Sequence, residues 1–150
     1  MRNLAVLILL GGSACQEPPK TGQMVQVVRG LVDLHAWDPA TEGLGQYGYD
    51  AVMNAGPEVF LSLAAHLTDE TPTALYDRTF DIKVSLGDVC FYMLLKLTGF
   101  KRDLFLEDGA FISSQLPNPI FCIRWKDGAA SRRKAQARFL KLLTPPDSDP

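Results

Sequence analysis

The sequence predicts a mainly α-helical domain, built as a compact stack of helices with a few short extended segments. Residues 89–95 are seven consecutive apolar residues inside a stretch that has a helix-capping pattern at each end. Apolar residues also recur at three- and four-residue spacing from Met24 to Leu34. Since 47% of the 150 residues are hydrophobic, the chain can bury one core, and we expect a single domain over residues 24–144.

The first fifteen residues have the layout of an export signal. A short basic start, M-R-N, precedes the apolar run L-A-V-L-I-L-L, and small residues lead to Cys15. Gly12-Ser13-Ala14-Cys15 resembles the lipobox of bacterial lipoproteins, in which the cysteine receives a diacylglyceryl group and becomes the first residue of the mature protein. The resemblance implies a signal peptide at 1–14 and a lipidated Cys15. A plain secreted protein is the alternative, because Gly12 and Ala14 also suit ordinary signal peptidase.

Lipidation would hold the mature chain on a membrane. One acyl chain binds marginally, at about 0.8 kcal/mol per buried methylene group, whereas the lipoprotein modification supplies several chains. In that family an aspartate after the cysteine commonly retains the protein in the inner membrane. Gln16 stands there instead, so the resemblance implies the periplasmic face of an outer membrane where the host has one. Residues 15–23 are expected to be the lipidated N-terminus and a flexible tether, and residues 145–150 a disordered tail.

Helices are expected where apolar residues recur every three or four positions or where capping residues bound an apolar run. The predicted helical segments are 24–37, 49–55, 57–67, 85–99 and 129–143. The central helix, within Ser85–Phe100, is apolar on every side and should be covered on every side. Ser85 and Asp88 have the form of a capping box, and Gly99 can take the left-handed conformation that ends a helix. The core side of the last helix is expected at Ala135, Phe139, Leu142 and Leu143.

Short extended segments are expected between these helices. Residues 71–84 alternate weakly and favour an extended segment or a small strand with no obvious partner. Asp108-Gly109 predicts a turn between two short extended pieces of 103–114. Residues 120–125, I-F-C-I-R-W, are rich in branched and aromatic side chains and favour a short strand or a packed loop.

One segment resembles a known repeat. Tyr49–Asp69 is similar to a HEAT-type helical hairpin, whose second helix typically opens near a proline, here Pro57, and ends in Leu-x-Asp. The resemblance implies a HEAT-like stack in which the helix after Ser85 starts a further pair.

Charge is unevenly distributed along the chain, although the net charge is only −2 and predicts no nucleic-acid binding. From Asp33 to Asp88 there are ten acidic and two basic residues, and from Arg124 to Lys141 seven basic and one acidic. The two segments could neutralise each other across the fold, or one could be a docking face. The candidate acidic face, which suits a basic protein, comprises Asp69, Glu70, Asp77 and Asp81. The candidate basic face, which suits anionic lipid head groups or cell-wall polymers, comprises Arg132, Arg133, Arg138 and Lys141.

The cysteines allow one disulfide. If Cys15 is lipidated, Cys90 and Cys122 remain as a possible pair in an oxidising compartment. The bridge would close a loop of roughly 33 residues and contribute on the order of 3 kcal/mol. Alternatively, Cys90 is a small hydrophobic residue of its helix.

Few residues suggest catalysis. His35 and His66 are the side chains expected to titrate near neutral pH, and His66 has Asp69 and Glu70 within one helical turn. These residues are too few for a metal site, and no hydrolase, zinc-protease, P-loop or dinucleotide motif occurs. We therefore expect no catalytic residue, metal or cofactor.

The sequence favours a non-enzymatic, membrane-anchored envelope lipoprotein that acts as a protein-binding module. An inhibitor or immunity protein for an envelope-acting enzyme is one concrete version. A structural component of a multi-protein envelope assembly is the second hypothesis. A hydrolase using His66 with Asp69 or Glu70 is the third.

Overall fold

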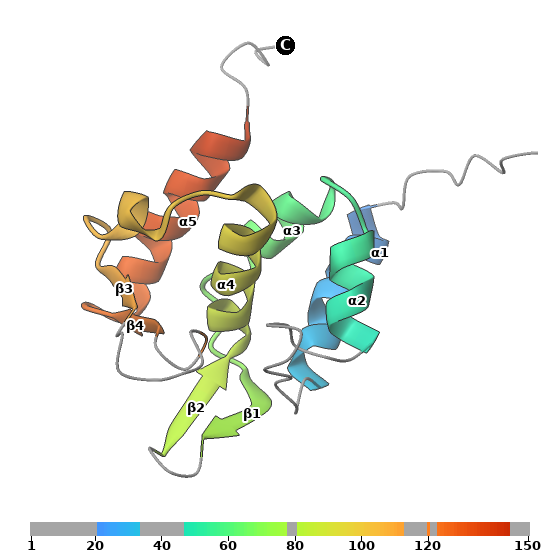
Figure 1. Cartoon of the computed structure of the whole chain (residues 1–150), viewed down its shortest axis with the longest axis horizontal. Helices are drawn as coiled ribbons and strands as arrows, with labels where there is room; N and C mark the ends of the chain where they lie inside the picture. Colours follow the sequence, from blue (N-terminus) through green and yellow to red (C-terminus); the bar gives the residue numbers. More distant parts are fainter. Residues whose placement is uncertain (1–20, 34–46, 78–80, 113–119, 121–122, 145–150) are drawn as a thin grey trace, which may run out of the picture.

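The computed structural model describes residues 21–33, 47–77, 81–112, 120 and 123–144 (Figure 1). Within them the α-helices are α1 (Thr21–Arg29), α2 (Tyr47–Asn54), α3 (Val59–Ala65), α4 (Leu86–Thr98) and α5 (Ala129–Leu143). The 3-10 helices are η1 (Gly30–Asp33) and η2 (Arg102–Phe105), and the strands are β1 (Pro72–Asp77), β2 (Ile82–Ser85), β3 (Ala110–Ile112) and β4 (Ile123–Trp125). The mainly helical class predicted from the sequence is confirmed.

Helix α4 is the central element, and both of its predicted ends are confirmed. The Ser85 hydroxyl accepts a hydrogen bond from the Asp88 amide, while the Asp88 carboxylate accepts one from the Ser85 amide, so the capping box is complete. At the other end Gly99 adopts the left-handed conformation, with φ of 68°, and its N–H donates to the Leu95 carbonyl.

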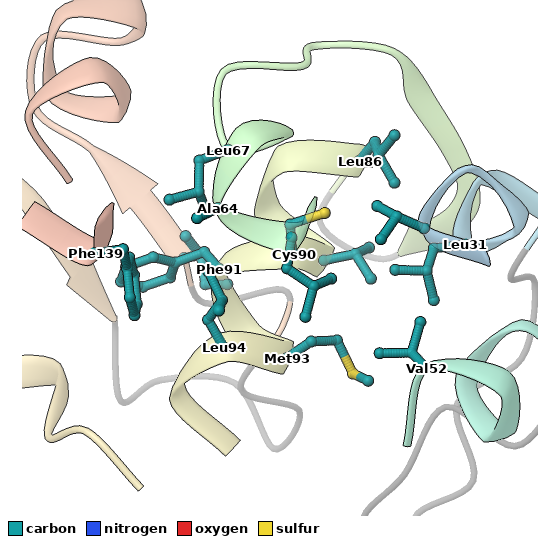
Figure 2. Packing of buried hydrophobic residues seen from close by; sticks show 14 of the residues in the cluster. Leu31, Val52, Ala64, Leu67, Leu86, Cys90, Phe91, Met93, Leu94 and Phe139 are labelled. Carbon is teal, nitrogen blue, oxygen red and sulfur yellow. The ribbon is translucent and has the colours of Figure 1, made fainter. Parts of the chain in front are cut away.

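The core surrounds α4 on both sides (Figure 2). Met93 faces Leu31 of η1 and Val52 of α2, whereas Phe91 faces Phe139 of α5 (Figure 2). The Phe91 and Phe139 rings meet edge to face, with centroids 5.9 Å apart. Phe105 of η2 stacks on Phe139 at 4.2 Å. Each of these aromatic pairs adds about 0.5–1.5 kcal/mol beyond the area it buries.

The strands form two antiparallel hairpins. β1 pairs with β2, with Tyr76 opposite Lys83, so the segment 71–84, for which the sequence suggested no partner, pairs with itself. β3 pairs with β4, with Ala110 opposite Trp125. A two-stranded hairpin alone is marginal in water. Each is therefore held by side chains that it buries in the helical core, among them Leu75, Val84, Ala110 and Ile123.

Several predicted boundaries and faces are corrected. Helix α1 begins at Thr21, inside the predicted tether, and its α-helical part ends at Arg29 before the chain continues as η1. Residues 103–105, predicted to be extended, belong instead to the 3-10 helix η2, which buries Phe105. Helix α5 has its predicted bounds, but Leu142, predicted to face the core, is 45% exposed.

The elements are arranged around the pair α3 and α4. Helices α1 and α2 lie on one side of this pair, and α5 with β3 and β4 lies on the other (Figure 1). The β1–β2 hairpin extends from the lower edge in this view, while the start of α1 and the end of α5 both lie toward the upper edge. The HEAT-like stacking is not confirmed, since the β1–β2 hairpin comes between α3 and α4 in the chain. No described helix is both long and apolar enough to cross a membrane.

Candidate functional site

The four residues of the predicted acidic face belong to one hairpin but lie at its two ends. Asp69 and Glu70 precede β1, Asp77 ends β1, and Asp81 precedes β2. Glu70 and Asp81 are exposed and Asp69 is half-buried, whereas the side chain of Asp77 lies outside the described residues. Because a strand rises about 3.3 Å per residue, β1 separates the two ends by about 20 Å. The acidic residues therefore form two separate groups rather than one continuous face. Asp69 and Glu70 lie at the base of the hairpin, and Asp77 and Asp81 lie at its tip.

The tip of the hairpin combines an aromatic and an acidic side chain. Tyr76, which is 45% exposed, donates its hydroxyl proton to the Asp81 carboxylate at 2.7 Å. Asp81 has a positive φ of 52°, a conformation that aspartate tolerates better than most residues. Tyr76 carries no signal of its own in the sequence, although exposed aromatic residues are enriched on binding surfaces.

The base of the hairpin is fixed to the start of α4. The amides of Leu86 and Gly87 donate to the carbonyls of Thr71 and Asp69, each at 2.8 Å. The Asp69 carboxylate in turn accepts from the Thr71 amide at 2.9 Å. Hydrogen bonding by Thr71 is the largest cause that lowers the pKa of Asp69, and it acts against the opposite effect of partial burial. Asp69 thus remains an anion well below neutral pH.

Arg132 does not belong to an exposed basic face, contrary to the sequence prediction. Its side chain is buried, and its guanidinium Nη2 donates to Asp88 Oδ1 at 2.8 Å. The guanidinium also lies over the ring of Trp125, 5.0 Å from the centroid. A charge removed from water in this way requires a partner, and Asp88 supplies it.

The Asp88 carboxylate is fully used by its neighbours. Oδ1 accepts from Arg132 and from the indole N–H of Trp125 at 2.7 Å, and Oδ2 accepts from the amide and the hydroxyl of Ser85. These bonds join α4, β4 and α5 in the interior. Since both oxygens are occupied by structural partners, the network stabilises the fold and offers no free group for chemistry.

The outer side of α5 is nevertheless basic. Arg133, Lys134 and Lys141 are exposed, whereas Arg138 is half-buried and makes a bidentate ion pair with Asp108. Lys134 was missed by the sequence analysis, although its spacing to Arg138 and Lys141 places all three on one helix face. An open depression of about 400 Å³ lies on this face, and it is lined by Asp108, Lys134, Ala137, Arg138 and Lys141.

The two oppositely charged segments, which the sequence suggested could neutralise each other, meet at one ion pair in the interior of the described part of the chain. The buried pair of Asp88 and Arg132 joins them. The exposed acidic residues Asp50 and Glu70 belong to α2 and to the hairpin base, away from the outer side of α5 (Figure 1).

No relative identifies this chain. No family model matches it, and neither the curated proteins nor the solved structures contain a match.

His66 is placed at the C-cap of α3, and its Nδ1 lies 2.8 Å from the Ser62 carbonyl oxygen. The carbonyls of Ala64 and Ala65, which directly precede His66, accept hydrogen bonds from the Gln136 side chain of α5. Among the described residues no group of three or more histidine, cysteine or acidic side chains is placed to hold a metal ion. His35 lies outside the described residues.

Cys90 is buried in α4 and forms no disulfide with any residue that the structure describes. Burial raises the pKa of this thiol, so it stays protonated at neutral pH and is a poor nucleophile. Cys15 and Cys122 lie outside the described residues. The lipidation of Cys15 and the bridge between Cys90 and Cys122 therefore stay predictions.

Proposed function

We propose that this protein is an exported envelope lipoprotein, anchored to a bacterial membrane through Cys15, whose domain binds another envelope protein through the β1–β2 hairpin. The observation that carries this proposal is the position of the hairpin. It lies at the edge of the molecule opposite the start of α1, which follows the proposed anchor (Figure 1). A hairpin in this position would point away from the membrane and toward a partner.

The chemistry of the hairpin favours a basic partner. Glu70 at the base and Asp81 at the tip are exposed, and Tyr76 adds an aromatic contact beside Asp81. Fixed negative charges steer an oppositely charged protein and orient it, and tyrosine is enriched where proteins bind each other. The hydrogen bonds from Leu86 and Gly87 hold the hairpin base before binding, which reduces the entropy lost in the complex.

An inhibitor or immunity protein for an envelope-acting enzyme is the version that we favour, with the helices as its scaffold. The HEAT-like stacking implied by Tyr49–Asp69 is part of this proposal. The alternatives are a structural component of a multi-protein envelope assembly and, third, a hydrolase using His66 with Asp69 or Glu70.

The anchor is tested by the mass of the N-terminus. We expect the protein purified from membranes to begin at Cys15 and to carry a diacylglyceryl group, with or without a further acyl chain. A Cys15→Ser variant should be recovered from the soluble fraction. An uncut Met1 or an unmodified Cys15 in the membrane-derived protein would refute the anchor.

The docking surface is tested by co-purification from detergent-solubilised membranes. We expect one partner in equimolar amount, and its loss in a Glu70→Lys/Asp81→Lys variant. The matched control is Asp50→Lys/Asp103→Lys, which changes the charge equally at two exposed acidic residues outside the hairpin. Equal loss in both variants would contradict the hairpin, and recovery of several subunits would favour the assembly. Turnover that disappears in His66→Ala, without a partner, would favour the hydrolase.

A further inference from the structure

The C-terminal half of α5 combines the residue types that bind a membrane surface. Lys134, Arg138 and Lys141 follow one another on one face at the spacing of helical neighbours. Leu140 and Leu142, on either side of Lys141, are 38% and 45% exposed. Since successive residues of an α-helix are about 100° apart, the two leucines flank the basic face on its two sides, and the basic residues between them can contact anionic lipid head groups.

Three basic side chains of α5 are available for a ligand. Among the ion pairs of the described residues, none involves Arg133, Lys134 or Lys141. Arg138 is held in place by Asp108 and lies 3.6 Å from Glu107. The depression around Ala137 is therefore lined by two exposed lysines, Lys134 and Lys141, and by a guanidinium that Asp108 holds in place. Three exposed cations outside the ion pairs of the described residues are the charge complement of an anionic surface.

The position of this half of α5 is also suitable. The end of α5 and the start of α1 lie toward the same edge of the molecule, opposite the β1–β2 hairpin (Figure 1). Cys15 precedes Thr21 by six positions, a length that spans at most about 20 Å when extended. An anchor at Cys15 would thus hold this edge near the bilayer, where even a weak contact is favoured by high effective concentration.

We propose that Lys134 and Lys141, beside the guanidinium of Arg138 that Asp108 holds, bind the head groups of anionic phospholipids as a second membrane contact, with Leu140 and Leu142 at the edges of this face. This inference rests on the proposed function only for the presence of a membrane at that edge. Stable attachment commonly requires two signals, such as a lipid chain and a basic patch. The contact would also fix the orientation of the domain, so that the hairpin points away from the bilayer.

The experiment uses the full chain with Cys15→Ser, so that lipidation contributes nothing. Binding is measured by co-sedimentation with vesicles of phosphatidylglycerol and phosphatidylethanolamine, and with vesicles of phosphatidylcholine alone. Each lysine near an anionic surface contributes about 1 kcal/mol, so Lys134→Gln/Lys141→Gln should bind the anionic vesicles about 30-fold more weakly. Lys83→Gln/Lys101→Gln is the matched control, because it removes the same charge from two exposed lysines outside α5. The N-terminal apolar segment is identical in all variants and cancels in this comparison.

We expect the control to bind like the parent, and both to bind phosphatidylcholine more weakly. Compared with the parent at low salt, binding to anionic vesicles should be weaker in Leu140→Ser/Leu142→Ser. It should also be weaker at 0.5 M salt, because salt screens exposed charges. Equal binding by the two lysine variants, with unchanged circular dichroism, would overturn the proposal. The proposal would also be overturned if the protein captured poly-L-glutamate through Lys134 and Lys141 but did not bind vesicles. That result would indicate that the ligand of this face is an acidic protein. Neither result depends on the acylation of Cys15, which the mass of the N-terminus tests separately.

Discussion

At the scale of single residues, Asp88 makes one contact that is local in the sequence and one that is long-range. It completes the capping box of α4 with Ser85, three positions away, and it pairs with Arg132, 44 positions away. The first interaction is local, and the sequence predicts it. The second requires α5 to lie against the start of α4, and it decides which arginine of α5 is buried. The close approach at Gly87, where an added Cβ would collide with the Leu67 carbonyl, belongs to the same contact.

We predict that Asp88→Ala lowers the free energy of unfolding by about 3–5 kcal/mol, because it leaves the buried Arg132 guanidinium without its partner. Part of the loss should be recovered in Asp88→Ala/Arg132→Met, which removes the unpaired buried charge, whereas the helix cap at Ser85 and the acceptor for the Trp125 indole stay absent. Urea unfolding measures both variants. Glu107→Ala, at an exposed ion pair, is the control and should leave the midpoint unchanged. A double variant no more stable than Asp88→Ala would contradict this account.

Cys90 allows a second prediction at this scale. Because burial raises the pKa of its thiol, iodoacetamide should alkylate Cys90 in the folded protein at pH 8 far more slowly than in urea, as peptide mass mapping would show. A thiol with a raised folded pKa stabilises the protein below its unfolded pKa, near 9.0, and this stabilisation is lost as pH rises above that value. Rapid labelling without urea would contradict the burial. Labelling in urea only after reduction would indicate the predicted bridge to Cys122.

At the scale of elements, α5 shows what a sequence pattern specifies and what it leaves open. Its bounds, Ala129–Leu143, are those predicted, since the prolines at 145 and 146 and the loss of apolar spacing are local signals. Its buried face is narrower than predicted. Phe139 is fully buried against Phe91 and Phe105, while Leu142 is 45% exposed, because no described element covers the side of the last turn on which it lies.

These two residues should therefore differ in their effect on stability. Phe139→Ala should reduce the free energy of unfolding by about 3–5 kcal/mol, because it opens a cavity among three aromatic rings. Leu142→Ala should change it by no more than about 0.5 kcal/mol. Thermal unfolding followed by circular dichroism compares the two. A large loss in Leu142→Ala would mean that another part of the chain covers the end of α5.

At the scale of the whole molecule, one core extends from α1 to α5 through α4. Leu31 and Met93 lie on one side of it and Phe139 on the other (Figure 2). The exposed charges, unlike the core, are separated. The acidic hairpin lies at one edge of the molecule and the end of the basic helix α5 lies at another (Figure 1). A single core predicts that the described elements unfold together, even though their surfaces differ.

We predict that Leu31→Ala shifts the unfolding transitions of distant elements equally. The substitution should cost about 2–5 kcal/mol, because Leu31 is fully buried. In a Trp37→Phe background, fluorescence reports Trp125 on the far side of α4, and far-ultraviolet circular dichroism reports the helices. Both midpoints should move to lower urea by the same amount. A shift confined to circular dichroism would indicate that α1 and α2 unfold independently of α5.

The sequence by itself determined the features that depend on neighbouring residues. The capping box of Ser85 and Asp88, the left-handed Gly99 and both ends of α5 were predictable because each involves residues within one or two helical turns. The mainly helical class follows from the same local signals. The acidic residues of the hairpin could also be named, although not their division between base and tip.

Only the tertiary structure decided which side chains of each element face inward. Charge counting placed Arg132 on the surface, but a buried carboxylate from α4 draws it into the core. The predicted basic face also lacked Lys134. The sequence pattern could not show that segment 71–84 pairs with itself. These outcomes depend on contacts between residues far apart in the chain, where the cost of burying a charge is offset by a partner that no local pattern specifies.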